Sequence, residues 1–381
     1  MRTEAVNVSP RGALYCPLML RARRLAPSLA LAAASAALTV LAFEAAFRLL
    51  HVPVGTVQIN RATVRRSANP RLLFELRSGA VARAEVDYRI NAAGLRGPEV
   101  SEEKPAGVRR IAVLGDSVAF GYWVAEKDAF PRQLESMLNE AEGGPVEVLN
   151  LAVPGYNLDQ EIETLRSKAL ALAPDLVVVA FCLNDLEGVF SYELGLVQDR
   201  TERRRNLVGR AWDALLPHSV LLSWIEYRLA EAEARRAFVR ARDPLGGPLY
   251  EPAVSEQRKA LVARFTELRA LLAPRGIPGL VAVFPVFAGR FERYRYRDLH
   301  RAVVEAATES GLRAVDLLDC FSAYDFRPVR VDVVHPSPMG HRIAAHAVRD
   351  ALCDKDLSCG TPGGRSCSSY RSEEFPRVHG Y

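Results

Sequence analysis

The chain has 381 residues, of which 49% are hydrophobic and 25% are charged, proportions typical of one large globular domain with attached segments. Its net charge of +5 is modest. The basic residues are scattered and form no stripe interleaved with aromatic residues, which disfavours a nucleic-acid-binding protein.

The N-terminal segment is predicted to anchor the chain in a membrane. Residues 1–24 are polar and basic, whereas residues 25–43 carry no charge and nearly reach the ~20 residues that span a bilayer. The basic flank favours a cytoplasmic N-terminus, so the rest of the chain would lie in the periplasm or outside the cell.

A cleaved signal peptide is the alternative to this anchor, because residues 34–36 have the small side chains of a cleavage site. A buried core helix is a third interpretation, which so uniform an apolar run disfavours. We favour an uncleaved transmembrane anchor over residues 25–50, since the apolar run continues past residue 36 to Phe43.

Residues 51–108 are predicted to form an accessory leader that packs beside the main domain. Its last part, residues 88–97, has the pattern of a strand followed by a tight turn. We expect the polar residues of this turn to serve structure and not chemistry.

The main domain is predicted to begin with a buried strand over residues 111–114, since a continuous apolar run is typical of a parallel strand covered on both faces. Gly115 then allows the backbone to turn. Ser117 follows at the carboxyl end of the strand, where open α/β sheets bind ligands. Ser117 is therefore a candidate nucleophile, with a helix cap as the structural alternative.

The rest of the domain, up to about residue 352, alternates between strands and helices. This alternation predicts a parallel sheet with helices on both faces. Further strands are predicted over residues 146–151, 176–181, 280–284 and 312–317. Helices are predicted from a cap at Asp128 to the break at residues 143–145, and over residues 159–173, 255–273, 298–310 and 342–352.

Residues 186–260 interrupt this alternation and have no strand-like pattern. They contain an Arg-rich run and an apolar helical segment over residues 219–242. We interpret them as an inserted helical cap near the site that shapes substrate access, with a peripheral packing helix as the alternative.

Three further segments carry candidate site residues. Gly155 follows the second predicted strand, where it could be a turn glycine or offer its backbone N–H to a reacting carbonyl. Asn184 follows the third strand and could be a loop cap or an oxyanion donor. Asp332 and His335 are three residues apart after the last strand. A turn would bring this carboxylate beside the imidazole, which is what a serine nucleophile requires of its base.

These four segments, in this order, resemble the four blocks of the SGNH, or GDSL-type, hydrolase family. The resemblance covers about residues 109–352, and the leader and anchor are similar to those of membrane-tethered bacterial members. The matching residues are Gly115-Asp116-Ser117, Gly155, Asn184-Asp185, and Asp332 with His335.

The resemblance implies a three-layer α/β/α, flavodoxin-like fold with a five-stranded parallel sheet. It implies Ser117 as nucleophile, His335 as general base and Asp332 as the residue that orients this base. The oxyanion donors would be the backbone N–H groups of Ser117 and Gly155 and the Asn184 side chain.

Two features of the sequence depart from known patterns. Cys182 replaces the glycine that usually begins the third block, and a buried, unreactive thiol is its expected state. Val118 also differs from many members. An α/β-hydrolase, the nearest alternative enzyme fold, would require Gly-x-Ser-x-Gly, but Ala119 occupies the last position.

The sequence thus predicts a serine esterase that cleaves a short-chain acyl ester of a cell-envelope, carbohydrate or lipid substrate. An O-acyltransferase that modifies a glycan and a non-enzymatic envelope-binding protein are the alternatives. No cofactor is predicted, and no metal, because metal-ligand spacing is absent near the site.

The tail, residues 353–381, has the composition of a disordered segment rich in Cys, Ser and Gly. A disulfide between two of Cys353, Cys359 and Cys367 is possible outside the cytoplasm, and the spacing does not select the pair. A zinc site would lack a convincing fourth ligand.

Overall fold

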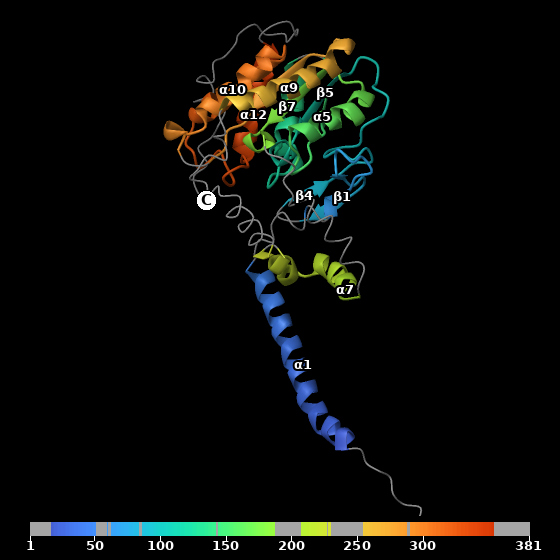
Figure 1. Ribbon diagram of the computed structural model, residues 1–381. Helices are drawn as coiled ribbons and strands as arrows, with labels where there is room; N and C mark the ends of the chain where they lie inside the picture. The colour runs from blue at the N-terminus through green and yellow to red at the C-terminus, as the bar shows by residue number, and fades with distance from the viewer. Residues whose placement is uncertain are drawn as a thin grey trace, which may run out of the picture.

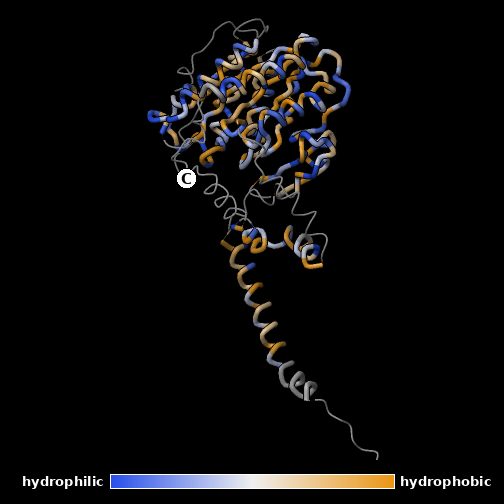
Figure 2. The backbone as a smooth tube through the Cα atoms, viewed as in Figure 1, coloured by the Kyte–Doolittle hydropathy of each residue, from blue (hydrophilic) through white to orange (hydrophobic). Residues whose placement is uncertain are grey.

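A computed structural model of the chain describes residues 17–50, 59, 62–83, 86–141, 144–186, 207–226, 228–229, 254–287 and 290–353. The first element is a long helix, α1 (Pro17–Leu49), which extends away from the rest of the chain (Figure 1). Its segment Pro27–Leu49 has a mean hydropathy of 1.9 and is not buried against the rest of the chain, and Figure 2 shows the apolar residues along it. By length and composition this helix could cross a membrane, as the run over residues 25–43 predicted.

The centre of the fold is a parallel sheet of five strands in the order β6-β5-β7-β8-β9. This order, with the second strand in sequence at the edge and the first beside the third, is that of flavodoxin-like sheets. The predicted fold class is therefore confirmed. The strands are β5 (Arg109–Gly115), β6 (Val146–Asn150), β7 (Leu176–Phe181), β8 (Gly279–Val283) and β9 (Arg313–Asp316).

Helices cover both faces of this sheet because both faces of its strands are apolar. In β5, Ile111 and Val113 belong to one buried cluster and Ala112 and Leu114 to the other. The helices of the first cluster are α4 (Phe130–Ala141) and α12 (Pro338–Cys353), and those of the second are α5 (Leu158–Ser167), α9 (Val254–Leu272) and α10 (Arg297–Glu309).

The leader forms two small antiparallel hairpins that pack against the first cluster. The Tyr88 ring stacks on Phe120 with centroids 5.7 Å apart, and the Tyr156 hydroxyl donates to the carbonyl of Phe74. The leader therefore contacts the segment that directly follows Ser117. The hairpin strands are β1 (Val64–Arg66) with β2 (Phe74–Leu76), and β3 (Val81–Arg83) with β4 (Asp87–Arg89).

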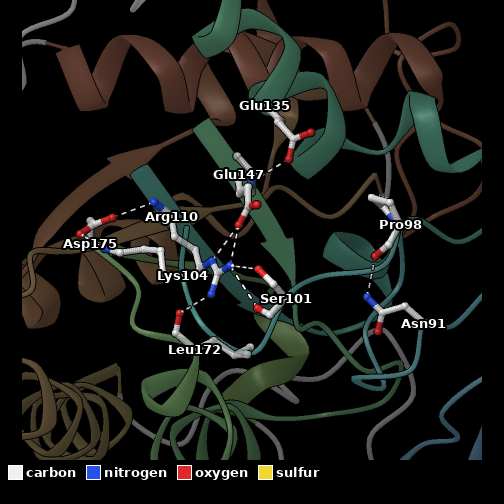
Figure 3. Close-up of polar contacts among 10 residues, drawn as sticks. Asn91, Pro98, Ser101, Lys104, Arg110, Glu135, Glu147, Leu172 and Asp175 are labelled. Atoms are coloured by element: carbon white, nitrogen blue, oxygen red, sulfur yellow. Dashed lines mark hydrogen bonds and ion pairs between the residues drawn. The ribbon is translucent and has the colours of Figure 1, made fainter. Parts of the chain in front are cut away.

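A fully buried arginine connects the leader, β5 and β6 at the amino end of the sheet (Figure 3). The guanidinium of Arg110 donates to Glu147 on β6 at 2.8 Å, to the carbonyl of Leu172 at 2.8 Å and to the carbonyl of Ser101 at 3.2 Å. The Arg110 backbone N–H donates to Asp175 at 2.7 Å. These bonds satisfy the buried charge and fix the end of the sheet opposite to Ser117.

The described part of the insertion contains α7 (Leu207–Leu215) and a helical segment over residues 220–226. The long-range contacts of residues 216–226 run to the C-terminal end of α1, whereas Arg258, in the last part of the insertion, pairs with Glu309 of α10. Residues 187–206 and 230–253 lie outside the described residues, so the interpretation of the insertion as a cap near the site stays a prediction.

The predicted tail lies outside the described residues, apart from Cys353. This cysteine ends α12 and is a free thiol. Cys320, which the sequence did not single out, is disulfide-bonded, and its partner is outside the described residues.

Gly340 allows α12 to approach the loop over residues 329–336. A Cβ at this position would lie 2.2 Å from the carbonyl oxygen of Val329 and 2.8 Å from Cβ of Pro336. Gly340→Ala is therefore expected to lower the free energy of unfolding by about 1–3 kcal/mol, the usual cost of overpacking. Denaturant unfolding measures this loss. Gly144→Ala is the matched control, because its Cβ meets nothing within 4 Å; an equal loss in both variants would contradict the argument.

Candidate active site

Ser117 stands on a tight turn between β5 and the short helix α3 (Ser117–Phe120). The turn depends on Gly115, since a Cβ there would lie 2.7 Å from Cβ of Ala119. Asp116 is the N-cap of α3, and its side chain accepts the backbone N–H of Val118 at 2.8 Å. The residues around Ser117 are buried, whereas Ser117 itself is partly exposed, so its hydroxyl is accessible at the carboxyl end of β5.

Asp332 and His335 lie in the loop that precedes α12. One carboxylate oxygen of Asp332 accepts the backbone N–H groups of Val334 and His335, both at 2.8 Å, which folds the loop into a turn. The other oxygen lies 2.7 Å from Nδ1 of His335. The opposite ring nitrogen, Nε2, lies 2.9 Å from Oγ of Ser117. Serine, imidazole and carboxylate thus form one continuous chain of hydrogen bonds.

This geometry determines which proton each group holds. Asp332 accepts, so Nδ1 of His335 carries the hydrogen and Nε2 is left to accept the proton of Ser117. Burial opposes ionisation of Asp332, but the hydrogen bonds and charge of His335 and two backbone N–H groups hold its pKa at about 2. The carboxylate therefore stays ionised at neutral pH and can stabilise a protonated imidazole.

Asn184 and Gly155 lie at the same edge of the sheet. The side-chain nitrogen of Asn184 donates to Asp116 at 2.7 Å. An amide nitrogen has two hydrogens, so this bond orients Asn184 and leaves its second N–H to donate elsewhere. Gly155 has a φ of 78°, and its loop is held at the end of β5 by the bond from Val153 N–H to the Gly115 carbonyl.

A buried carboxyl group that the sequence did not single out lies near Asp116. Glu161, in the first turn of α5, is 1% exposed, and its two side-chain oxygens have no hydrogen-bond partner among the described residues. Burial, together with the charge of Asp116, raises the pKa of Glu161 well above its ordinary value. Burial also raises the pKa of Asp116, although the bonds from Asn184 and Val118 oppose the shift. Glu161 therefore keeps its proton to a higher pH than an exposed glutamate does.

Glu161→Gln is therefore expected to stabilise the protein increasingly as the pH rises. In the unfolded chain Glu161 ionises near pH ~4.3, but in the fold it must remain protonated to a higher pH. Its contribution to stability is complete below pH ~4.3 and is lost as the pH rises towards its folded pKa, by up to about 1.4 kcal/mol per pH unit. Denaturant unfolding at pH 5 and pH 8 measures the difference. Glu140→Gln, on the exposed face of α4, is the control and should show no such pH-dependent difference. A difference in unfolding free energy between Glu161→Gln and the wild type that is the same at both pH values would contradict the assignment.

Arg96 is a second residue that the sequence analysis missed, because it treated the turn after β4 as structural only. Its guanidinium is 2% exposed and donates to the backbone carbonyls of Phe120, Gly121 and Val124. It also lies over the ring of Tyr88 at 4.6 Å. Arg96 therefore fixes the chain directly after α3, and so the helix that carries Ser117.

Tyr122 lies beside the imidazole of His335, with ring centroids 5.5 Å apart and the rings nearly edge to face. Because Tyr122 is 2% exposed, it forms a fixed wall behind the imidazole. Cys182 is fully buried, and burial raises the pKa of its thiol, so it behaves as a small apolar residue. Within the described residues, no group of three or more His, Cys, Asp or Glu side chains could hold a metal ion.

The chain is similar to one protein family and to several solved structures. The model of the GDSL-like lipase/acylhydrolase family matches residues 113–343. Similar solved structures include the acetylxylan esterase Axe2 of Geobacillus stearothermophilus, which is 16% identical with a TM-score of 0.41, covering 64% of this chain and 94% of that chain. Another is a lipolytic protein of the G-D-S-L family from Desulfitobacterium hafniense DCB-2, which is 10% identical with a TM-score of 0.37, covering 64% and 99%.

The comparison with curated proteins gave no match. The family model alone spans more than half of the chain, and it includes Ser117, Gly155, Asn184, Asp332 and His335. The chain therefore belongs to the GDSL-like lipase/acylhydrolase family and is an SGNH-type hydrolase.

Proposed function

We propose that the protein is a membrane-anchored serine esterase that removes short acyl groups from a cell-envelope carbohydrate or lipid. The observation that carries this proposal is the hydrogen-bonded chain from Ser117 Oγ to His335 Nε2 at 2.9 Å, and from His335 Nδ1 to Asp332 at 2.7 Å. This chain provides a nucleophile, its base and the group that orients the base.

Acylation begins when His335 Nε2 takes the proton of Ser117 and Oγ attacks the ester carbonyl carbon. The carbonyl oxygen becomes negative, and the backbone N–H groups of Ser117 and Gly155 and the second N–H of Asn184 donate to it. His335 then gives its proton to the departing alcohol, and an acyl-enzyme remains on Ser117. Water, activated by His335, releases the acid and restores the hydroxyl.

The proposal of a short acyl group rests on the wall beside the site. The buried ring of Tyr122 lies against His335, and the ring of Trp123 lies 6.1 Å from that of Tyr122. We propose that these two rings restrict the space for a long acyl chain beside the imidazole. A small acyl group needs no room there.

The proposed topology places α1 across the membrane and the catalytic domain on the non-cytoplasmic side. The uncharged length of residues 27–43 and the basic residues before them support this orientation. The disulfide at Cys320 adds support, because disulfides persist in oxidising compartments. A reporter fused after residue 353 that is active only in the cytoplasm would reject the orientation.

A panel of 4-nitrophenyl esters of increasing acyl length tests the chemistry and the acyl preference together. We expect hydrolysis to be fastest with acetyl and to fall as the chain lengthens. Product analysis with a glycan acceptor present then separates release of free acid from acyl transfer to a hydroxyl. Transfer without hydrolysis would replace the esterase by an O-acyltransferase that uses the same Ser117.

Asn184→Ala is expected to lower kcat by about 10²–10³-fold, a loss of about 2.7–4 kcal/mol of transition-state stabilisation, with little change in KM. An oxyanion donor binds a charge that exists only during the reaction. The variant should also melt at a lower temperature, because Asp116 loses its donor. The measurement is kcat and KM on an acetyl ester at a temperature where both proteins are folded.

Asn139→Ala is the matched control for this variant. The Asn139 amide bonds both backbone groups of Val146 at the amino end of β6, away from Ser117. This variant should lose stability and keep its kcat. If Asn184→Ala likewise loses only stability, Asn184 is part of the scaffold and not an oxyanion donor.

A further inference from the structure

The helix α7 (Leu207–Leu215) has one apolar face that is exposed to solvent. Its apolar residues recur at helical spacing and fall on one side of the helix, and the exposed Arg210 lies at one edge of this face, about 100° from its centre. Large side chains on this face are highly exposed, at 75% for Leu207, 79% for Val208 and 57% for Leu215. The residues of this face are Leu207, Val208, Ala211, Ala214 and Leu215.

The segment that follows α7 is attached to the C-terminal turns of α1. The carboxylate of Glu44 accepts the Ser219 hydroxyl at 2.8 Å and the backbone N–H groups of the next two residues at 3.0 Å, so it caps the helix that begins there. The ring of Phe47 packs edge to face on Trp224 with centroids 5.3 Å apart. These contacts fix the insertion to α1 although the two segments are far apart in the sequence.

The attachment point coincides with the expected surface of a bilayer. Residues 27–43 of α1 carry no charge, and Glu44 is the first charged residue after them. At 1.5 Å per residue this run spans about 26 Å, close to the ~30 Å hydrocarbon core. Figure 1 places α7 at the height of the C-terminal end of α1, between that helix and the catalytic part. The exposed apolar face therefore lies where a membrane interface would be.

We propose that α7 lies in the membrane interface with its apolar face inserted among the lipids. Amphipathic helices with apolar residues on one face and basic residues on the other bind bilayers in this orientation. Arg210 lies at the edge of the apolar face, where its guanidinium can reach the headgroups, and Arg203, Arg204 and Arg205 precede α7 in the sequence, so anionic headgroups would add electrostatic attraction. This inference rests on the proposed membrane anchor and adds a second contact to it.

A second contact changes what the anchor can do. A single helix fixes the distance of a domain from the membrane but leaves its tilt free. The attachment of residues 219–224 to α1, together with an inserted α7, would hold the insertion at the membrane surface, and so keep the catalytic domain, from which the insertion departs after β7, close to the bilayer. The enzyme would then act on esters at or near the membrane surface, the substrates within reach of a domain so held.

Quenching of tryptophan fluorescence by brominated lipid tests this arrangement in the full chain. The protein is placed in nanodiscs of ordinary lipid and of lipid with brominated acyl chains, and the added emission of each variant is measured against the parent chain. Val208→Trp reports on the apolar face of α7. Arg210→Trp is the matched control, because position 210 lies about 160° around the same helix from position 208. Leu38→Trp reports on α1, where Leu38 is 67% exposed.

We expect the added emission of Val208→Trp and Leu38→Trp to be largely lost in brominated lipid and that of Arg210→Trp to be retained. Loss of the added emission for Leu38→Trp but not for Val208→Trp would overturn the proposal of an interfacial helix and leave the proposed anchor intact. Retention for both would overturn the anchor as well. A tryptophan at position 208 that neither brominated lipid nor aqueous acrylamide quenches would be covered by protein, such as a second copy, which also overturns the proposal.

Discussion

Ser117→Ala is expected to abolish ester hydrolysis, with kcat falling about 10⁶-fold, the loss seen when a serine protease loses its nucleophile. The oxyanion donors and substrate contacts remain, so a small residual rate above the uncatalysed reaction should persist. Ser117 is partly exposed, and among the described residues its hydroxyl bonds only the imidazole, so the melting temperature should stay near that of the wild type. The measurements are kcat on an acetyl ester and thermal unfolding.

A fluorophosphonate probe provides an independent test of the same residue, because it reacts only with an activated serine. The wild type should be labelled and Ser117→Ala should not. Ser136→Ala, on the exposed side of α4, is the matched control and should be labelled like the wild type. Labelling of Ser117→Ala at the wild-type rate would reject Ser117 as the nucleophile.

The sheet could be predicted from the sequence because its strands are buried on both faces. Residues 176–181 are uniformly apolar, every one of them is buried in β7, and the predicted and observed bounds agree. Helix ends were harder to predict. The helix expected over residues 159–173 ends at Ser167, and a short 3₁₀ turn follows before Pro174. Propensity alone does not distinguish these two kinds of helical turn.

The candidate site could be predicted where its residues are close in sequence or follow a strand. Asp332 and His335 are three positions apart, so a single turn brings them together. The bond between Asn184 and Asp116 joins residues 68 positions apart, and no local pattern indicates it. Arg96 and Glu161 were missed for a related reason. A buried charge is recognised by what surrounds it in space, and the sequence shows only that the residue is charged.

The insertion shows the same limit on a larger scale. A helix was predicted over residues 219–242, of which the structure describes a helical segment at residues 220–226, but an apolar face does not reveal its partner. The structure places that face on α1, where Glu44 caps a segment 175 positions away. The predicted anchor and the predicted insertion, which are far apart in the sequence, thus contact each other in the structure.

Asp332→Asn is expected to lower kcat about 10⁴-fold, the loss seen when the same change is made in a serine protease triad. In the wild type the Asp332 carboxylate can only accept, so Nδ1 of His335 must carry the hydrogen. An amide can instead donate to Nδ1, which places the imidazole hydrogen on Nε2, opposite Ser117 Oγ. The base would then present a proton to the nucleophile and could not remove one.

The dependence on pH distinguishes this role from a purely structural one. Burial opposes ionisation of Asp332, but its bonds to His335 hold its pKa at about 2, below the ~3.9 of the unfolded chain. The ionised carboxylate therefore stabilises the fold above pH ~3.9, and this contribution is lost as the pH falls towards 2. The variant should lack this acid-dependent loss and should remain slow at every pH where the wild type is active. Asp319→Asn, on the surface, is the control, and a kcat within tenfold of wild type for Asp332→Asn would remove Asp332 from the mechanism.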